Sequence, residues 1–143
     1  MRKLLKLTND YVFKRIFGKV GNEDITRSFI KAATGIEFKN INLEDSPILE
    51  RELIESKMGI LDVKVIGDSI NNIDIEMQVV KSEYIAERIL WYWAKMYTRA
   101  LKAGDGYDRA RKAICILIAD FKLENLKDIE DYYTRWKVRE EQR

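Results

Sequence analysis

Apolar and polar positions repeat with two different periods along this chain, and the change of period marks the predicted elements. Two N-terminal segments and one later segment place apolar residues at helical spacing, each with a capping residue in front. A glycine follows each of the three segments, where it is suited to end a helix. The predicted helices run from a Thr8 cap to Phe17, from an Asn22 cap to a stop at Gly35, and from Ser82 to about Ala103.

Between the second and third predicted helices the pattern changes to alternation, which is typical of half-buried strands. The clearest strands are 59–66 and 70–80, joined by Gly67-Asp68-Ser69, which has the composition of a hairpin turn. Residues 36–41 also alternate, and 112–119 form an apolar run that predicts a buried strand reached by a crossover. The predicted fold is α/β, a central mixed sheet flanked by helices in the order α-α-β-β-β-α-β, and 132–138 is a candidate further strand.

The alternation sorts acidic residues onto one face of the predicted strand pair. Asp62 lies opposite the Val63 face of its strand, and Glu76 lies opposite the Ile75 face of the next, so two acidic faces can lie side by side. In the long predicted helix, Ile85, Ile89 and Trp93 belong to an apolar face. A neighbouring stripe contains Arg88, Tyr92, Lys95, Arg99 and Lys102.

Composition narrows the chemistry that this chain can perform. With 143 residues, 46% of them hydrophobic and 35% charged, the chain predicts one soluble domain, a core over 1–126 and a charged, aromatic tail over 127–143. The absence of histidine excludes histidine bases and histidine metal ligands, and the single cysteine, Cys115, lies in an apolar run as a small hydrophobic residue. Any metal site is therefore built from oxygen, which points to Mg²⁺, Mn²⁺ or Ca²⁺. No apolar stretch approaches the length of a membrane span, and we expect a cytoplasmic protein with no membrane partner.

Two acids on adjacent apolar strands need a partner, because an unpaired buried carboxylate costs several kcal/mol or more. One interpretation pairs Asp62 and Glu76 with Lys64 or with the basic stripe. The other places a hard cation between them, where it would polarise a phosphate and lower the pKa of a bound water. Spacing alone leaves both interpretations open.

Four motifs in order resemble the Rpn-type recombination-promoting nuclease and transposase family. Two of them carry the acids, Gly59-Ile60-Leu61-Asp62-Val63-Lys64 and Asn72-Ile73-Asp74-Ile75-Glu76-Met77-Gln78. The other two are the helical runs 7–18 (LTNDYVFKRIFG) and 87–97 (ERILWYWAKMY). The likeness covers nearly the whole chain, and four ordered motifs are far more specific than an isolated pair of acids.

The resemblance implies a PD-(D/E)XK fold in which Asp62 and Glu76 ligate magnesium and the Met77 carbonyl completes the set. Asp10 is similar to an extra acid that many members of the superfamily place on the first helix, although a capping or surface role is an equal alternative. Gln78 stands where the superfamily usually has lysine, and it can bond a water or phosphate without carrying charge. Lys95, or else Lys64, is the expected substitute, with a counterion role for Lys64 as the alternative.

The implied function is a divalent-metal-dependent DNA endonuclease associated with recombination or mobile elements. The basic stripe would then contact DNA phosphates, although a solvated helix face is the competing interpretation. A second hypothesis is a DNA-binding module that keeps the fold without efficient chemistry. A third is an assembly domain that uses Tyr132, Tyr133 and Trp136, and a homodimer also stays open.

Overall fold

A computed structural model describes residues 5–43, 60–67, 72–78, 81, 83–99, 101–110 and 112–138 of the chain. Their order is α1 (Asp10–Phe17), α2 (Glu23–Thr34), β1 (Ile41–Leu43), β2 (Ile60–Gly67), β3 (Asn72–Gln78), α4 (Ile85–Arg99) and β4 (Ala113–Ala119). Short 3-10 turns cover Tyr107–Arg109 and Glu124–Leu126. The predicted mixed α/β class is confirmed.

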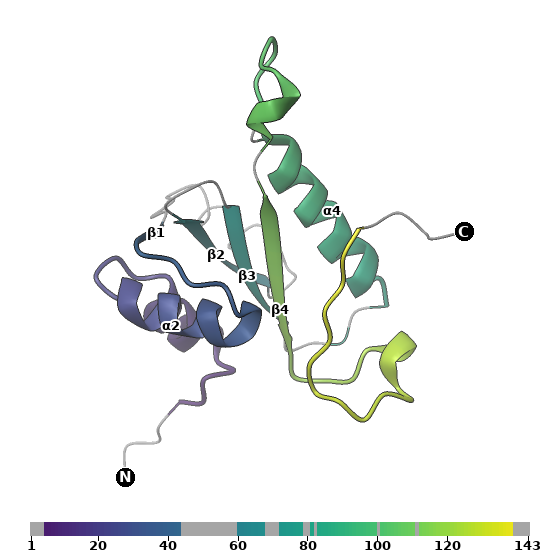
Figure 1. The fold of residues 1–143 in the computed structure, drawn as a ribbon. Helices are drawn as coiled ribbons and strands as arrows, with labels where there is room; N and C mark the ends of the chain where they lie inside the picture. The colour runs from purple at the N-terminus through teal and green to yellow at the C-terminus, as the bar shows by residue number, and fades with distance from the viewer. Residues whose placement is uncertain are drawn as a thin grey trace.

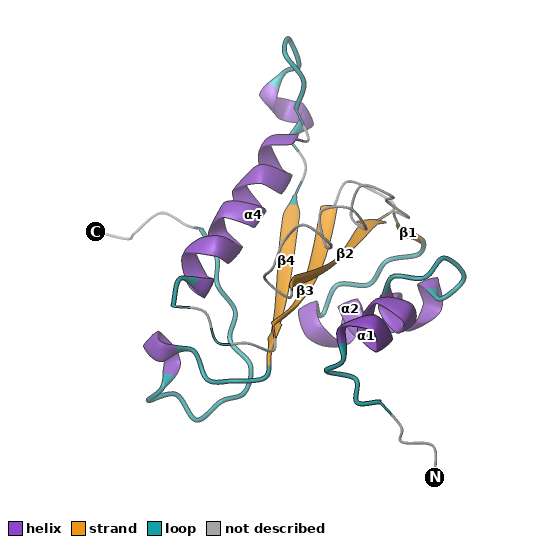
Figure 2. Cartoon of the chain, turned by 180° about the vertical axis from the view of Figure 1, so that it is seen from behind, coloured by secondary structure: helices purple, strands orange, loops and turns teal. Residues whose placement is uncertain are grey.

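The described strands form one sheet in the order β1-β2-β3-β4. The first three are antiparallel neighbours, whereas β3 and β4 run parallel and are joined by way of α4. Figure 2 shows α1 and α2 on one side of this sheet and α4 on the other. The arrangement is a three-layer sandwich, and the two faces of the sheet therefore have different surroundings.

The core lies between the sheet and the two N-terminal helices. Phe13 of α1 and Ile30 of α2 are fully buried against inward residues of the strands. Because side chains alternate along a strand, every second position belongs to this face. The strand residues that pack in or against the core are Ile41, Leu43, Val63, Val65, Ile73, Ile75, Ile114, Ile116 and Ile118.

The two N-terminal helices are joined by hydrogen bonds as well as by the core. The Asn9 side chain caps α1 by accepting from the Val12 N–H, so the predicted Thr8 cap is wrong by one residue. At the other end, Asn22 Nδ2 donates to the Ile16 carbonyl at 2.9 Å and Thr26 Oγ1 donates to the Phe17 carbonyl at 2.7 Å. The start of α2 thereby satisfies carbonyls that the end of α1 leaves open.

Several other predicted boundaries differ from the structure. Residues 36–40 are irregular and the strand begins at Ile41. The long helix ends at Arg99, and Ala103 and Gly104 form a turn in which the φ of Gly104 is 92°. Asp68 and Ser69 of the predicted hairpin turn lie outside the described residues.

The predicted strand over 132–138 is wrong, because this segment is irregular. Its polar groups instead bond to the C-terminal end of α2. The Tyr133 hydroxyl donates to the Ala33 carbonyl at 2.7 Å, and Arg135 donates to the Thr34 carbonyl at 2.9 Å. A guanidinium at a helix C-terminus also complements the helix dipole. The C-terminal segment is thus fixed to α2, about a hundred residues earlier in the chain.

Candidate active site

The register of β2 and β3 places the two predicted acids directly opposite each other. Asp62 pairs with Glu76, and the next pair on the same face is Lys64 with Asp74. Directly opposed residues in an antiparallel pair have Cβ atoms about 4.5–5.5 Å apart. The side chains of Asp62, Asp74 and Glu76 lie outside the described part of the chain, so the backbone register is what locates them.

These acids occupy the face of the sheet that looks away from α1 and α2. Their neighbours Val63 and Ile75 are buried in the core, so the positions between them belong to the opposite face. This is the face that α4 approaches, and α4 contacts β4 and β3. The acidic pair therefore lies on the α4 side of the sheet by its strand register.

The charges on this face are unequally matched. Half-buried Lys64 lies directly opposite Asp74, which gives that acid a cationic neighbour. Asp62 and Glu76 face each other instead, and like charges directly opposite destabilise a sheet. Glu76 has Leu117 of β4 as its other neighbour, which offers no charge. By register, therefore, Asp74 has a directly opposed cation, whereas Asp62 and Glu76 are opposed to each other.

Comparison with known families shows to which family the chain belongs. Residues 7–143 match the PD-(D/E)XK nuclease family transposase domain. The chain belongs to this family. No curated protein and no solved structure matches it. PD-(D/E)XK nucleases generally use divalent metals, so the family supplies the class of cofactor while leaving the ion undetermined.

The carboxylate and amide oxygens at these positions fit a hard divalent cation. Asp62 and Glu76 supply two carboxylates, and Gln78 follows on the same face of β3. The Met77 carbonyl, predicted as a further ligand, belongs to the strand between them, and the side chains of Met77 and Gln78 are outside the described residues. Among the side chains that the structure describes, no group of three or more cysteine, aspartate or glutamate residues gathers to hold a metal.

The backbone of Lys95 lies away from the level of Glu76 along the sheet, and the catalytic role of this lysine stays a prediction. Trp93 Nε1 donates to the Ala113 carbonyl at 3.0 Å, which fixes the height of α4 along the sheet. In the pairing of β3 with β4, Ala113 lies beside Asn72, four residues before Glu76. Four residues span about 13 Å of strand, at roughly 3.3 Å per residue. Because α4 runs antiparallel to β4, Lys95 lies on the far side of Trp93 from Glu76. Its Nζ lies 3.6 Å from the centroid of the Trp91 ring.

Arg88 lies much closer to the level of the acids. It precedes Trp93 by five residues, about 7.5 Å of helix toward the end of the sheet that carries Glu76. Arg88 and Tyr92 are half-buried on one flank of α4, and Trp93 is on the other flank. A crossover between parallel strands is right-handed in about 98% of cases, which turns the Arg88 flank toward β3 and β2. Along the helix axis, Arg88 is therefore nearest to the level of Glu76, Tyr92 is farther from it, and Lys95 is farther still.

The other predicted site residues are Asp10, Arg99 and Lys102. Asp10 is the first residue of α1, which packs on β2 from the Val63 side, across the sheet from the acids, and its side chain is outside the described residues. Its catalytic role stays a prediction. Lys102 is exposed in the turn after α4, and the Arg99 side chain is outside the described residues.

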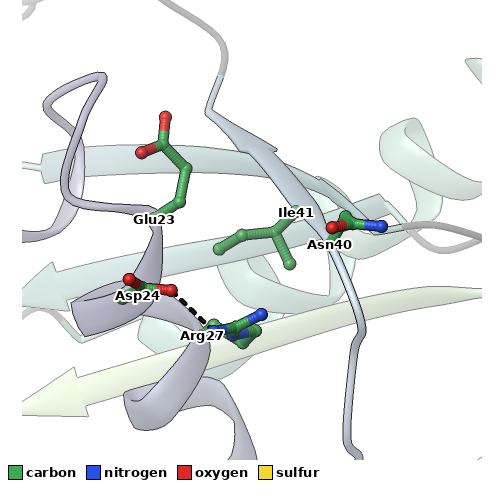
Figure 3. A pocket seen from close by; sticks show the side chains of 5 residues that line it. All are labelled: Glu23, Asp24, Arg27, Asn40 and Ile41. Atoms are coloured by element: carbon green, nitrogen blue, oxygen red, sulfur yellow. Dashed lines mark hydrogen bonds and ion pairs between the residues drawn. The ribbon is translucent and has the colours of Figure 1, made fainter.

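A small hollow between α2 and β1 is separate from this site. It measures about 120 Å³ and its polar lining comes mostly from the first turns of α2 (Figure 3). The charged groups there already bond to one another or to backbone: Arg27 donates to Asp24 and to the Lys39 carbonyl, each at 2.6 Å. Hydrogen bonds from the Gly21 N–H hold the pKa of Glu23 below its usual value. The lining is Glu23, Asp24, Arg27, Asn40 and Ile41.

Proposed function

We propose that this chain is a divalent-metal-dependent DNA endonuclease that hydrolyses phosphodiester bonds, associated with recombination or mobile elements. The observation that carries the proposal is the β2–β3 register, which places Asp62 opposite Glu76 and Lys64 opposite Asp74. Family membership supports the same conclusion independently. Two carboxylates left to face each other are suited to share one Mg²⁺, with Mn²⁺ or Ca²⁺ as substitutes.

Each residue then has a distinct role in the proposed mechanism. Asp62, Glu76 and the Met77 carbonyl hold the ion, which when bound polarises the phosphate and lowers the pKa of water. Gln78 orients the attacking water or a phosphate oxygen by hydrogen bonding. Arg88 stabilises the charge that develops on the phosphate, in place of the strand lysine that the family motif usually supplies.

The flank of α4 supplies contacts to the DNA backbone. Arg88, Lys95 and Lys102 offer cations, and Tyr92 offers a hydroxyl donor. Phosphate contacts of this kind position the strand without reading its sequence, so we expect little sequence preference from them. Because the net charge is only +2, this affinity depends on the local stripe and falls as salt rises.

Plasmid nicking with Mg²⁺ tests the proposal. Asp62→Asn and Glu76→Gln should each reduce the rate by at least about 100-fold, because losing several kcal/mol of metal stabilisation costs a factor of ten for every ~1.4 kcal/mol. Asp74→Asn is the matched control, since it removes an acid from the same face one pair further along. We expect it to keep most of the activity. Wild-type rates in both Asp62→Asn and Glu76→Gln would remove the pair from the mechanism.

A DNA-binding module without efficient chemistry is the second candidate. Gln78 and the position of Lys95 favour it, because neither places a lysine charge beside the acidic pair. The same purified protein distinguishes the two. Salt-dependent retardation of DNA with no cleavage in Mg²⁺, Mn²⁺ or Ca²⁺ would establish binding without catalysis.

A further inference from the structure

The aromatic residues of α4 divide into two groups with different surroundings. Trp93 is half-buried, donates its indole N–H to the Ala113 carbonyl and stacks on Tyr97 with ring centroids 5.5 Å apart. Trp91 is on the other flank of the helix and is 52% exposed. Packing accounts for Trp93. It does not account for an indole ring that is half open to solvent.

Trp91 lies beside a cation, on the opposite flank of α4 from Trp93. Its ring has Lys95 Nζ 3.6 Å from the centroid on one side and meets Tyr92 edge-on at 5.2 Å. Arg88 and Tyr92 continue the same flank toward β3 and β2. An exposed aromatic ring beside a basic group is the combination that binds single-stranded nucleic acid, through base stacking and phosphate contacts.

We propose that Trp91 is a stacking platform for an unpaired base, and that the substrate of this site carries a single-stranded segment next to the cut. The inference rests on the proposed nuclease function and specifies its substrate class. Trp91 precedes Trp93 by two residues, so it lies roughly 10 Å from the level of Glu76 along the strand direction. At about 3.4 Å per stacked nucleotide, this component alone corresponds to about three nucleotides between the stacked base and the scissile phosphate.

The interaction energies allow Lys95 to exchange its contact with the Trp91 ring for a contact with the bound DNA strand. An exposed cation–π contact contributes about 0.5–1 kcal/mol, whereas a stacked base contributes about 1–3 kcal/mol. Lys95 lies over one face of the ring, and the Trp91 side chain as a whole is 52% exposed. Lys95 then has a phosphate of the same strand within reach. This assigns Lys95 to strand binding, in agreement with its distance from the acids.

Fluorescence anisotropy in EDTA tests the proposal without requiring cleavage. The probes are a labelled single-stranded 20-mer and the blunt duplex of the same sequence. Trp91→Ala and Trp91→Leu should weaken single-strand binding about 5- to 100-fold, and Trp91→Phe should retain most of it. Trp91→Leu keeps apolar bulk without a ring and so separates stacking from simple packing. Duplex affinity should change less than about twofold.

Leu90→Ala is the matched control, because Leu90 is the preceding residue of α4 and is 58% exposed. We expect it to bind both probes as the wild type does. Equal losses for the two probes, no loss in Trp91→Ala, or a wild type that does not prefer the single strand would each overturn the proposal. A shift of Trp91→Ala from dimer to monomer on size exclusion, with unchanged DNA binding, would assign the ring to a protein interface. A chain that fails to cut DNA but shows the Trp91 effect would refute the nuclease proposal alone.

Discussion

Thr26 shows how much a single buried hydroxyl can contribute to this fold. It is fully buried, and its Oγ1 donates to the Phe17 carbonyl at 2.7 Å across the α1–α2 junction. Phe17 packs against the core, so the bond fixes the end of α1 close to the residues that cover β2. The acidic pair lies on the other face of that strand. A residue remote from the chemistry thus helps to hold one side of the sheet in place.

Replacing Thr26 by valine should destabilise the protein by about 1–3 kcal/mol. Valine keeps the shape of the side chain and removes the donor, which leaves the Phe17 carbonyl without its bond in a part-buried position. Thr26→Ser keeps the hydroxyl and should cost clearly less. Urea unfolding measures both free energies. Equal losses in the two variants would mean that the methyl group, and not the hydrogen bond, is responsible.

At the scale of elements, local pattern predicted which face the acids occupy but not which residues they oppose. Alternation with buried Val63 and Ile75 fixes the face, because a one-residue slip would expose the core side of the strand. The predicted turn over 67–69 would instead pair residue 66 with residue 70, and so Asp62 with Asp74. The actual register differs by two residues, which preserves the face and brings Glu76 opposite Asp62.

Two other differences between the predicted and the observed structure are caused by tertiary contacts. The aromatic segment 132–138 has the composition of a strand, but Tyr133 and Arg135 bond to carbonyls at the end of α2. The angular position of Lys95 on α4 was predictable from its spacing. Its height along the sheet was not, because the height depends on where Trp93 meets Ala113. The periodicity of a sequence predicts which side of a helix a residue occupies. How far along the sheet that residue lies depends on the tertiary contacts that the helix makes.

The end of β2 provides a test of docking at this scale. Gly67 is buried, and a Cβ added there would lie 2.5 Å from the Phe38 ring. Gly67→Ala should therefore cost about 1–3 kcal/mol through overpacking. Adding Phe38→Leu should recover part of that loss, although Phe38→Leu alone destabilises a buried position. Thermal or urea unfolding of the four proteins measures the coupling, and strict additivity would contradict a clash between these two residues.

At the scale of the whole molecule, the question is whether a protein cation or a bound ligand neutralises Asp62 and Glu76. The core on the α1–α2 side packs independently of these acids, since Val63, Val65, Ile73 and Ile75 form it. Repulsion between the two acids on the opposite face would therefore lower the stability of the fold without disturbing this core. Proteins often retain such destabilised groups where binding will use them, and the repulsion disappears when a cation binds.

Stability measured with and without Mg²⁺ decides this question. Without divalent ions, Asp62→Asn or Glu76→Gln should raise the free energy of unfolding by up to about 1 kcal/mol, because each removes one of two opposed like charges. Mg²⁺ at 100 times its Kd should stabilise the wild type by about 2.7 kcal/mol and neither variant appreciably. NaCl of equal ionic strength controls for screening. Variants less stable than the wild type in EDTA would show instead that a protein cation pairs with these acids, since removing one partner of a buried ion pair is destabilising.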